Sequence, residues 1–215
     1  MALESTAADR LTMLAKLMGL FLLGLIRLLT GAQARWQGCP PKAEQRIYFA
    51  NHQSHADLVL MWAALPAELR SITRPIAAKD YWTKTPFKQW ITTAVFNAIY
   101  VDRAKVGDQD PLEPLIDALQ SGDSIILFPE GTRGNQDDPQ NFKSGLYNLA
   151  LKFPDVVLVP AWINNVQRVM PKGEVVPVPI LCSVTFGAPV ALDAGEDRAH
   201  FLTRARRAVM DLRES

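Results

Sequence analysis

Short runs of apolar and β-branched residues recur along the chain from residue 46 onward, separated by longer stretches of mixed polarity. Runs of this length and composition are typical of buried strands. They lie at residues 46–50, 98–102, 124–128, 156–163 and 180–187, and residues 74–79 are a further short strand candidate. The stretches between them decide how these strands are connected.

The intervening stretches have the periodicity of helices. Residues 56–65 form an apolar stretch that ends at Pro66, and residues 81–96 predict a helix broken at Pro86. Further helices are expected at 111–122, at 143–153 and near the C-terminus, where one stripe contains Phe201, Leu202, Ala205, Ala208, Val209 and Leu212. Because strands alternate with helices, we expect an α/β fold in which helices cover a mostly parallel or mixed sheet. Residues 39–215 contain no linker or internal repeat and are interpreted as one domain.

The N-terminus carries a different pattern. Residues 17–26 are uncharged and are bounded by Lys16 and Arg27. A helix of about ten residues rises about 15 Å, half the apolar thickness of a bilayer. Long basic side chains at its two ends can reach the headgroups from within one leaflet. We therefore interpret residues 1–38 as an N-terminal membrane-associated helical segment, with its helix embedded in one leaflet.

Two alternatives remain open for this segment. Apolar residues extend over positions 11–29, so a tilted membrane span with Lys16 reaching back to the surface is one of them. The other is a secretory signal peptide, since Ala32 and Ala34 provide a small-residue cleavage site. The first strand follows soon afterwards, which favours the embedded helix over cleavage.

Composition places few limits on binding partners. The chain has 215 residues, 48% of them hydrophobic, with 23 basic and 22 acidic side chains. This hydrophobic fraction is ordinary for a globular protein and too low for a membrane protein with several spans. Cys39 and Cys182 lie far apart and have neither metal-site spacing nor a disulfide framework, which fits a reducing compartment.

Charge is nevertheless concentrated between residues 70 and 105. This stretch contains seven basic residues and interleaved aromatic side chains, against only Asp80 and Asp102. Such a pattern suits a membrane surface or anionic lipid headgroups, and it also suits nucleic acid. A solvated helix face with aromatic side chains in the core is the alternative interpretation.

The segment "FANHQSHADLVL", residues 49–60, joins a predicted strand to a predicted helix. Ser54 and Asp57 have the spacing of a helix capping box, which explains these two residues but not His52. Five helical residues correspond to about 500°, so His52 and Asp57 can meet only if His52 precedes the helix and Asp57 begins it. The end of a strand is also where open α/β sheets bind ligands. A metal site on His52, His55 and Asp57 is the alternative, although the only other histidine is His200.

A second polar loop follows another predicted strand, in "SIILFPEGTRG" at residues 124–134. After Pro129, this loop gathers four residues: Glu130, Gly131, Thr132 and Arg133. Glycine permits close approach of the backbone to a ligand, and arginine offers a bidentate contact to phosphate. Taken alone, the loop is also compatible with an ordinary polar turn.

Taken together, these segments resemble the glycerolipid acyltransferase family, which includes the lysophosphatidic acid acyltransferases. The resemblance covers residues 46–190 and rests on four blocks in the family's order: "NHQSHAD", "NAIYVDR", "FPEGTRG" and "VPAW". The segment "FKSGLYNLA" is similar to one that follows the third block in the family. Asn97 stands where the second block has glycine, which puts the acceptor preference in doubt, although asparagine tolerates left-handed backbone angles. One N-terminal helix is evident where the family has a pair.

The resemblance implies an O-acyltransferase domain at residues 39–215. Its substrates would be an acyl thioester, either acyl-CoA or acyl carrier protein, and the membrane lipid 1-acylglycerol 3-phosphate, giving phosphatidic acid. His52 would be the general base and Asp57 its orienting partner. The acceptor's glycerol phosphate would be held by Arg103, Glu130, Gly131, Thr132 and Arg133. No G-x-S-x-G motif is present, so direct attack on the thioester is favoured over an acyl-enzyme.

The family resemblance also implies expectations about cofactors, partners and location. We expect no metal or other cofactor, no nucleic-acid partner, and a location at a membrane on its cytoplasmic face. Within the family, glycerol 3-phosphate or another lysophospholipid is the alternative acceptor. Outside it, the alternatives are a catalytically silent lipid-binding protein and a metal-dependent hydrolase. The intact pair of His52 and Asp57 argues against a silent protein.

Overall fold

A computed structural model describes residues 2–31, 33–54, 56–102, 110–134, 138–164 and 181–214. Its α-helices are α1 (Ala2–Thr30), α2 (Asp57–Ala64), α3 (Ala67–Ser71), α4 (Lys79–Trp82), α5 (Pro86–Trp90), α6 (Glu113–Gln120), α7 (Gly145–Lys152) and α9 (Arg198–Met210). A π-helix, η1 (Ile91–Val95), follows α5, and a 3-10 helix, η2 (Asp211–Glu214), follows α9. The strands are β1 (Gln33–Trp36), β2 (Arg46–Ala50), β3 (Thr73–Ala78), β4 (Ile99–Val101), β5 (Ser124–Leu127), β6 (Val157–Asn164) and β7 (Ser183–Phe186).

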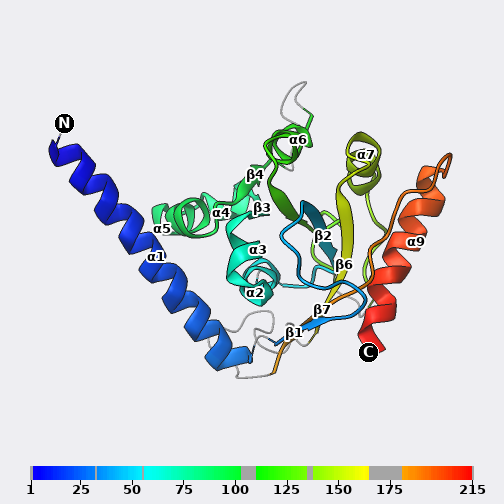
Figure 1. Cartoon of the computed structure of the whole chain (residues 1–215), viewed down its shortest axis with the longest axis horizontal. Helices are drawn as coiled ribbons and strands as arrows, with labels where there is room; N and C mark the ends of the chain where they lie inside the picture. The colour runs from blue at the N-terminus through cyan, green and yellow to red at the C-terminus, as the bar shows by residue number, and fades with distance from the viewer. Residues whose placement is uncertain are drawn as a thin grey trace.

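The described strands form a seven-stranded sheet in the order β1-β7-β6-β2-β5-β3-β4. Neighbouring strands are parallel, except that β6 and β7 are antiparallel. Helices flank this sheet (Figure 1). The expected α/β fold, with a mixed sheet covered by helices, is confirmed.

Strand β2 shows why its sequence forms a central strand. All five of its residues are buried, and alternate side chains enter different core clusters. Ile47 and Phe49 face the cluster contributed by α6, α7 and α9, whereas Tyr48 and Ala50 face the cluster contributed by α2 and α3. A strand covered on both faces requires an unbroken apolar run, which is what residues 47–50 supply.

The strand order determines where the two polar loops meet. Strand β2 pairs in parallel with β5, so the carboxyl ends of these two strands lie at the same edge of the sheet. The loop that follows β2 contains His52, and the loop that follows β5 contains Glu130. Residues separated by 78 positions in the sequence therefore come into direct contact.

The helical stretch expected at 81–96 is divided among α4, α5 and η1. The predicted break at Pro86 is confirmed, because Pro86 begins α5 after Thr85, whose hydroxyl accepts the N–H of Lys88. Proline fits this first helical position because its missing N–H has no partner there in any helix. Strand β1 was not predicted. It lies within the segment interpreted as N-terminal and pairs with β7, where Trp36 stacks on Phe186 at 4.1 Å between ring centroids.

Helix α1 runs along one side of the molecule, where it contacts α2 and η1 (Figure 1). Leu23 is buried against the protein, and Gly19 allows close approach to Val95 of η1. The other side of the helix exposes large apolar side chains, namely Met13, Leu14, Leu17, Leu20, Phe21, Leu25 and Leu28. No helix in the described part of the chain is both long and apolar enough to cross a membrane, so the span left open by the sequence is not found.

The turn before β4 shows how asparagine at position 97 replaces the glycine of the second family block. Asn97 has a φ of 48°, and among the described residues it is the only one other than glycine with positive φ. Asparagine adopts this left-handed region more readily than most residues. The prediction that the turn survives without glycine is confirmed.

Candidate active site

Asn51 fixes the start of the loop that carries His52. Its side-chain Nδ2 donates to the carbonyl oxygen of Ile163 at 3.1 Å, and the N–H of Ile163 donates to its Oδ1 at 2.8 Å. These paired hydrogen bonds are buried and join the end of β2 to β6. Asn51 begins the block "NHQSHAD", but the sequence pattern did not predict a role for it. Its position directly after a fully buried strand was the available signal.

The structure brings His52 and Asp57 together in the geometry that the turn permits. His52 lies in the turn, Asp57 is the first residue of α2, and His52 Nδ1 is 2.9 Å from Asp57 Oδ2. Asp57 is 1% exposed, and the same oxygen accepts the N–H groups of Gln53 at 2.6 Å and Ser54 at 2.8 Å. Asp57 therefore orients both the imidazole and the turn that carries it.

The capping box is only half formed. A capping box consists of two reciprocal hydrogen bonds. One of them is present, since the N–H of Ser54 donates to the Asp57 carboxylate. The hydroxyl of Ser54 instead accepts the N–H of Ala56 at 3.2 Å. Ser54 is thus bonded within the turn, and the carboxylate of Asp57 serves His52 as well as the cap.

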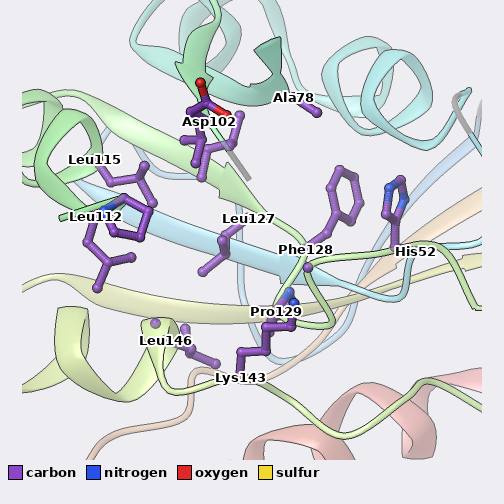
Figure 2. A pocket seen from close by; sticks show the side chains of 15 residues that line it. His52, Ala78, Asp102, Leu112, Leu115, Leu127, Phe128, Pro129, Lys143 and Leu146 are labelled. Atoms are coloured by element: carbon purple, nitrogen blue, oxygen red, sulfur yellow. The ribbon is translucent and has the colours of Figure 1, made fainter. Parts of the chain in front are cut away.

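The ring of Phe128 stacks on one face of the His52 imidazole. The two rings stack with centroids 4.4 Å apart and an interplanar angle of 17°. The His52 side chain remains 18% exposed, at a pocket that it lines together with Phe128 (Figure 2). Because Nδ1 is bonded to Asp57, Nε2 is the ring nitrogen left for a substrate.

Glu130 connects the two polar loops. Its Oε1 accepts the backbone N–H of His52 at 2.7 Å, and its Oε2 accepts the N–H of Gln140 at 2.7 Å. The residue is 2% exposed, and burial raises the pKa of its carboxyl, while the two backbone hydrogen bonds and His52 act in the opposite direction. The N–H of Gly134 also donates to the carbonyl oxygen of His52 at 2.8 Å. The main chain of His52 is therefore bonded on both sides to the loop after β5.

The other sequence-predicted residues lie at different depths. Gly131 adopts a φ of +69° in the turn, whereas Thr132 and Arg133 are exposed on the loop after it. Arg103 and His55 lie outside the described residues. The structure therefore places Glu130, Gly131, Thr132 and Arg133 in one loop beside His52 and Asp57.

A pocket of about 300 Å³ extends from His52 between β3, β4, β5, α6 and α7 (Figure 2). Its walls are mainly aliphatic, formed by Ile76, Ala78, Val101, Leu112, Leu115, Leu127 and Leu146. Asp102 and Lys143 are the charged side chains in its lining. An apolar chain can lie along these walls with one end at His52.

No group of three metal-ligating side chains occurs in the part of the chain that the structure describes. His200, the remaining histidine, lies on α9 with a largely exposed side chain bonded to Glu196 at 2.7 Å.

Comparison with known proteins identifies the family. Residues 37–164 match the model of the protein family described as Acyltransferase. The chain belongs to this acyltransferase family. The family expected from the sequence blocks is thereby confirmed.

Several relatives are named as acyltransferases of 1-acyl-sn-glycerol 3-phosphate. The chain is 29% identical over 138 residues to 1-acyl-sn-glycerol-3-phosphate acyltransferase alpha of Homo sapiens, across 62% of this chain and 46% of that protein. It is 30% identical over 185 residues to 1-acyl-sn-glycerol-3-phosphate acyltransferase of Limnanthes alba, across 84% and 62%. The chain thus spans about half the length of the first curated relatives that it matches.

A solved structure shares the fold. The 1-acyl-sn-glycerophosphate acyltransferase PlsC from Thermotoga maritima superposes with a TM-score of 0.64, over 96% of this chain and 80% of that chain. The sequence identity is 22%, so this likeness shows the fold alone.

The contacts of Glu130 yield a stability prediction. Glu130→Gln keeps one acceptor oxygen but places an amide NH₂ opposite one of the two backbone N–H groups, at a side chain that is 2% exposed, so it should lower the free energy of unfolding by about 1–3 kcal/mol. Urea denaturation followed by circular dichroism measures this change. Glu113→Gln, on the exposed surface of α6, is the control and should change stability by less than about 0.5 kcal/mol. Equal stability of both variants would show that the hydrogen bonds of Glu130 to His52 and Gln140 do not stabilise the two loops.

Proposed function

We propose that this protein transfers a fatty acyl group from an acyl thioester to the free hydroxyl of 1-acylglycerol 3-phosphate, forming phosphatidic acid. The observation that carries the proposal is the pair of His52 and buried Asp57 at the end of an apolar pocket. The names of the two relatives support the same acceptor.

In the proposed reaction, His52 is the general base. Nε2 of neutral His52 removes the proton of the acceptor hydroxyl while that oxygen attacks the thioester carbonyl carbon. The tetrahedral intermediate then collapses, the carbon–sulfur bond breaks, and the leaving sulfur takes the proton from the imidazolium. The products are an ester and a free thiol, and His52 returns to its neutral form. Asp57 orients the ring and stabilises the imidazolium.

The apolar pocket provides a place for an acyl chain. Aliphatic walls favour a hydrocarbon chain because its burial removes apolar surface from water. A chain held along these walls would present its carbonyl carbon near His52, at the mouth of the pocket. Both acyl-CoA and acyl carrier protein carry such a thioester, so this feature supports either donor.

The loop after β5 is proposed to bind the phosphate of the acceptor. Arg133 is exposed there and has the bidentate geometry that phosphate favours. Glu130 and Gly131 shape the loop, and Thr132 adds a hydroxyl beside Arg133. Arg103 remains a predicted phosphate ligand on the basis of the sequence alone. A fixed phosphate would hold the nearby hydroxyl in place for attack.

Helix α1 is proposed to hold the protein at the membrane that contains its acceptor. Its exposed side chains include Leu17 at 59%, Leu20 at 66% and Phe21 at 61% exposure. An exposed apolar patch of this kind marks an interaction site. Lys16 and Arg27 are exposed on the same helix and can reach lipid headgroups, which supports a position within one leaflet.

A panel of acceptors tests the reaction. With one labelled acyl-CoA and products identified by lipid mass spectrometry, the protein should acylate lysophosphatidic acid but not glycerol 3-phosphate. His52→Ala should lower turnover by about 10²- to 10⁴-fold. Its melting temperature should stay near that of the wild type, because Asp57 keeps its backbone donors. His200→Ala, on exposed α9, is the control and should retain activity.

Two outcomes would contradict different parts of this proposal. Transfer to glycerol 3-phosphate alone would exclude the proposed acceptor. Near-normal turnover by His52→Ala would exclude its role as the base.

Arg133→Lys tests the phosphate contact. The variant keeps the positive charge but loses the paired donors, so the KM for lysophosphatidic acid should rise by about tenfold. The KM for acyl-CoA should change little. Steady-state kinetics with each substrate varied in turn measures both constants. An equal rise for acyl-CoA would instead place Arg133 at the phosphates of the donor.

The membrane role of α1 can be tested without disturbing the core. Leu20→Ser combined with Phe21→Ser changes only exposed side chains, so the protein should leave the membrane fraction more readily. It should still acylate acceptor dispersed in detergent. Sedimentation with liposomes provides the measurement, and the variant Leu151→Ser, at an exposed leucine of α7, provides the control. Unchanged liposome binding would mean that α1 is not the anchor.

A further inference from the structure

Lys143 lies in a segment that is hydrogen-bonded to Pro129 and Glu130 in the loop after β5. The N–H of Lys143 donates to the carbonyl oxygen of Pro129 at 2.9 Å. On one side, the N–H of Gln140 is bonded to Glu130. Next to Lys143, the buried ring of Phe142 packs edge-on against Phe49, with 6.3 Å between centroids. The backbone of Lys143 is therefore held beside the proposed active site.

The side chain of Lys143 lies across the backbone of Gly131. A Cβ atom at Gly131 would be 2.7 Å from Lys143 Nζ and 2.9 Å from its Cδ, so only glycine leaves room for the lysine in this position. Lys143 lines the same pocket as His52, and Figure 2 shows its side chain below Pro129. Among the described residues, no carboxylate forms an ion pair with its ammonium group.

We propose that Lys143 binds the phosphate group of the acceptor. A lysine ammonium that lies at a substrate pocket, with no carboxylate partner among the described residues, is well suited to an anionic group of the substrate. The N-terminus of α7 adds a favourable partial charge, because Gly145 and Leu146 at its start line the same pocket. The proposal rests on the proposed function and adds a residue that the sequence blocks did not assign.

The size of the pocket favours the acceptor over the donor as the source of this phosphate. His52 and Lys143 line one pocket of about 300 Å³. In 1-acylglycerol 3-phosphate, the reacting hydroxyl and the phosphate are on adjacent carbons. In acyl-CoA, the nearest phosphate is separated from the thioester by the whole pantetheine arm. The short spacing in the acceptor therefore fits a reacting hydroxyl at His52 and a phosphate at Lys143 in the same pocket.

Lys143→Met keeps an unbranched side chain over Gly131 and removes the charge. We expect the KM for lysophosphatidic acid to rise at least about tenfold, with an unchanged KM for acyl-CoA. With monoacylglycerol, which lacks the phosphate, wild type and variant should have equal kcat/KM. Lys143→Arg should restore most of the affinity for lysophosphatidic acid. Lys152→Met, an exposed lysine at the other end of α7, is the matched control and should behave as wild type.

Other outcomes would overturn the proposal. A raised KM for acyl-CoA would assign Lys143 to the donor, and an equal loss with monoacylglycerol would exclude phosphate recognition. Calorimetric titration with short-chain lysophosphatidic acid, below its micelle concentration, measures binding without turnover. Weaker binding to Lys143→Met than to wild type supports the proposal even if no acyl transfer is detected, whereas equal binding contradicts it. Absence of transfer by the wild type would instead count against the proposed function.

Discussion

The site depends on one buried carboxylate, that of Glu130. Its two oxygens accept backbone N–H groups from His52 and Gln140, which lie in different loops. The carboxylate that accepts them is itself 2% exposed, and a charged acceptor forms stronger hydrogen bonds than a neutral one. The parallel pairing of β2 with β5 brings the loops together, and Glu130 fixes their separation. A residue expected to contact substrate thus bonds to the backbone that carries the proposed base.

Much of this arrangement could be predicted because its causes are local. The apolar runs that became β2, β5 and β6 are buried on both faces, so their composition alone identifies them. The placement of His52 before α2 and of Asp57 at its start followed from the angle between helical residues. The left-handed turn at Asn97 followed from the backbone preference of asparagine.

The features that escaped prediction depend on partners far away in the sequence. Strand β1 has only four residues, half of them exposed, and forms because β7 provides an edge with which it can pair. The role of Asn51 requires Ile163, which is 112 positions away. Lys143 was visible within "FKSGLYNLA", but its proximity to Gly131 depends on the path of the chain around the loop after β5. Composition and periodicity contain no information about such contacts.

Asp57 shows how the fold can favour the transition state of the proposed reaction over the ground state. All of its hydrogen bonds within the described residues are on Oδ2, while Oδ1 is buried without a donor. The backbone donors of Gln53 and Ser54 fix the orientation of the carboxylate through Oδ2 and leave Oδ1 without a hydrogen bond from the described residues. When His52 gains a proton, positive charge appears 2.9 Å from this carboxylate in a poorly solvated site. The stabilisation therefore grows as the proton is transferred, which is the property that accelerates a reaction and that tight binding of the substrate alone cannot provide.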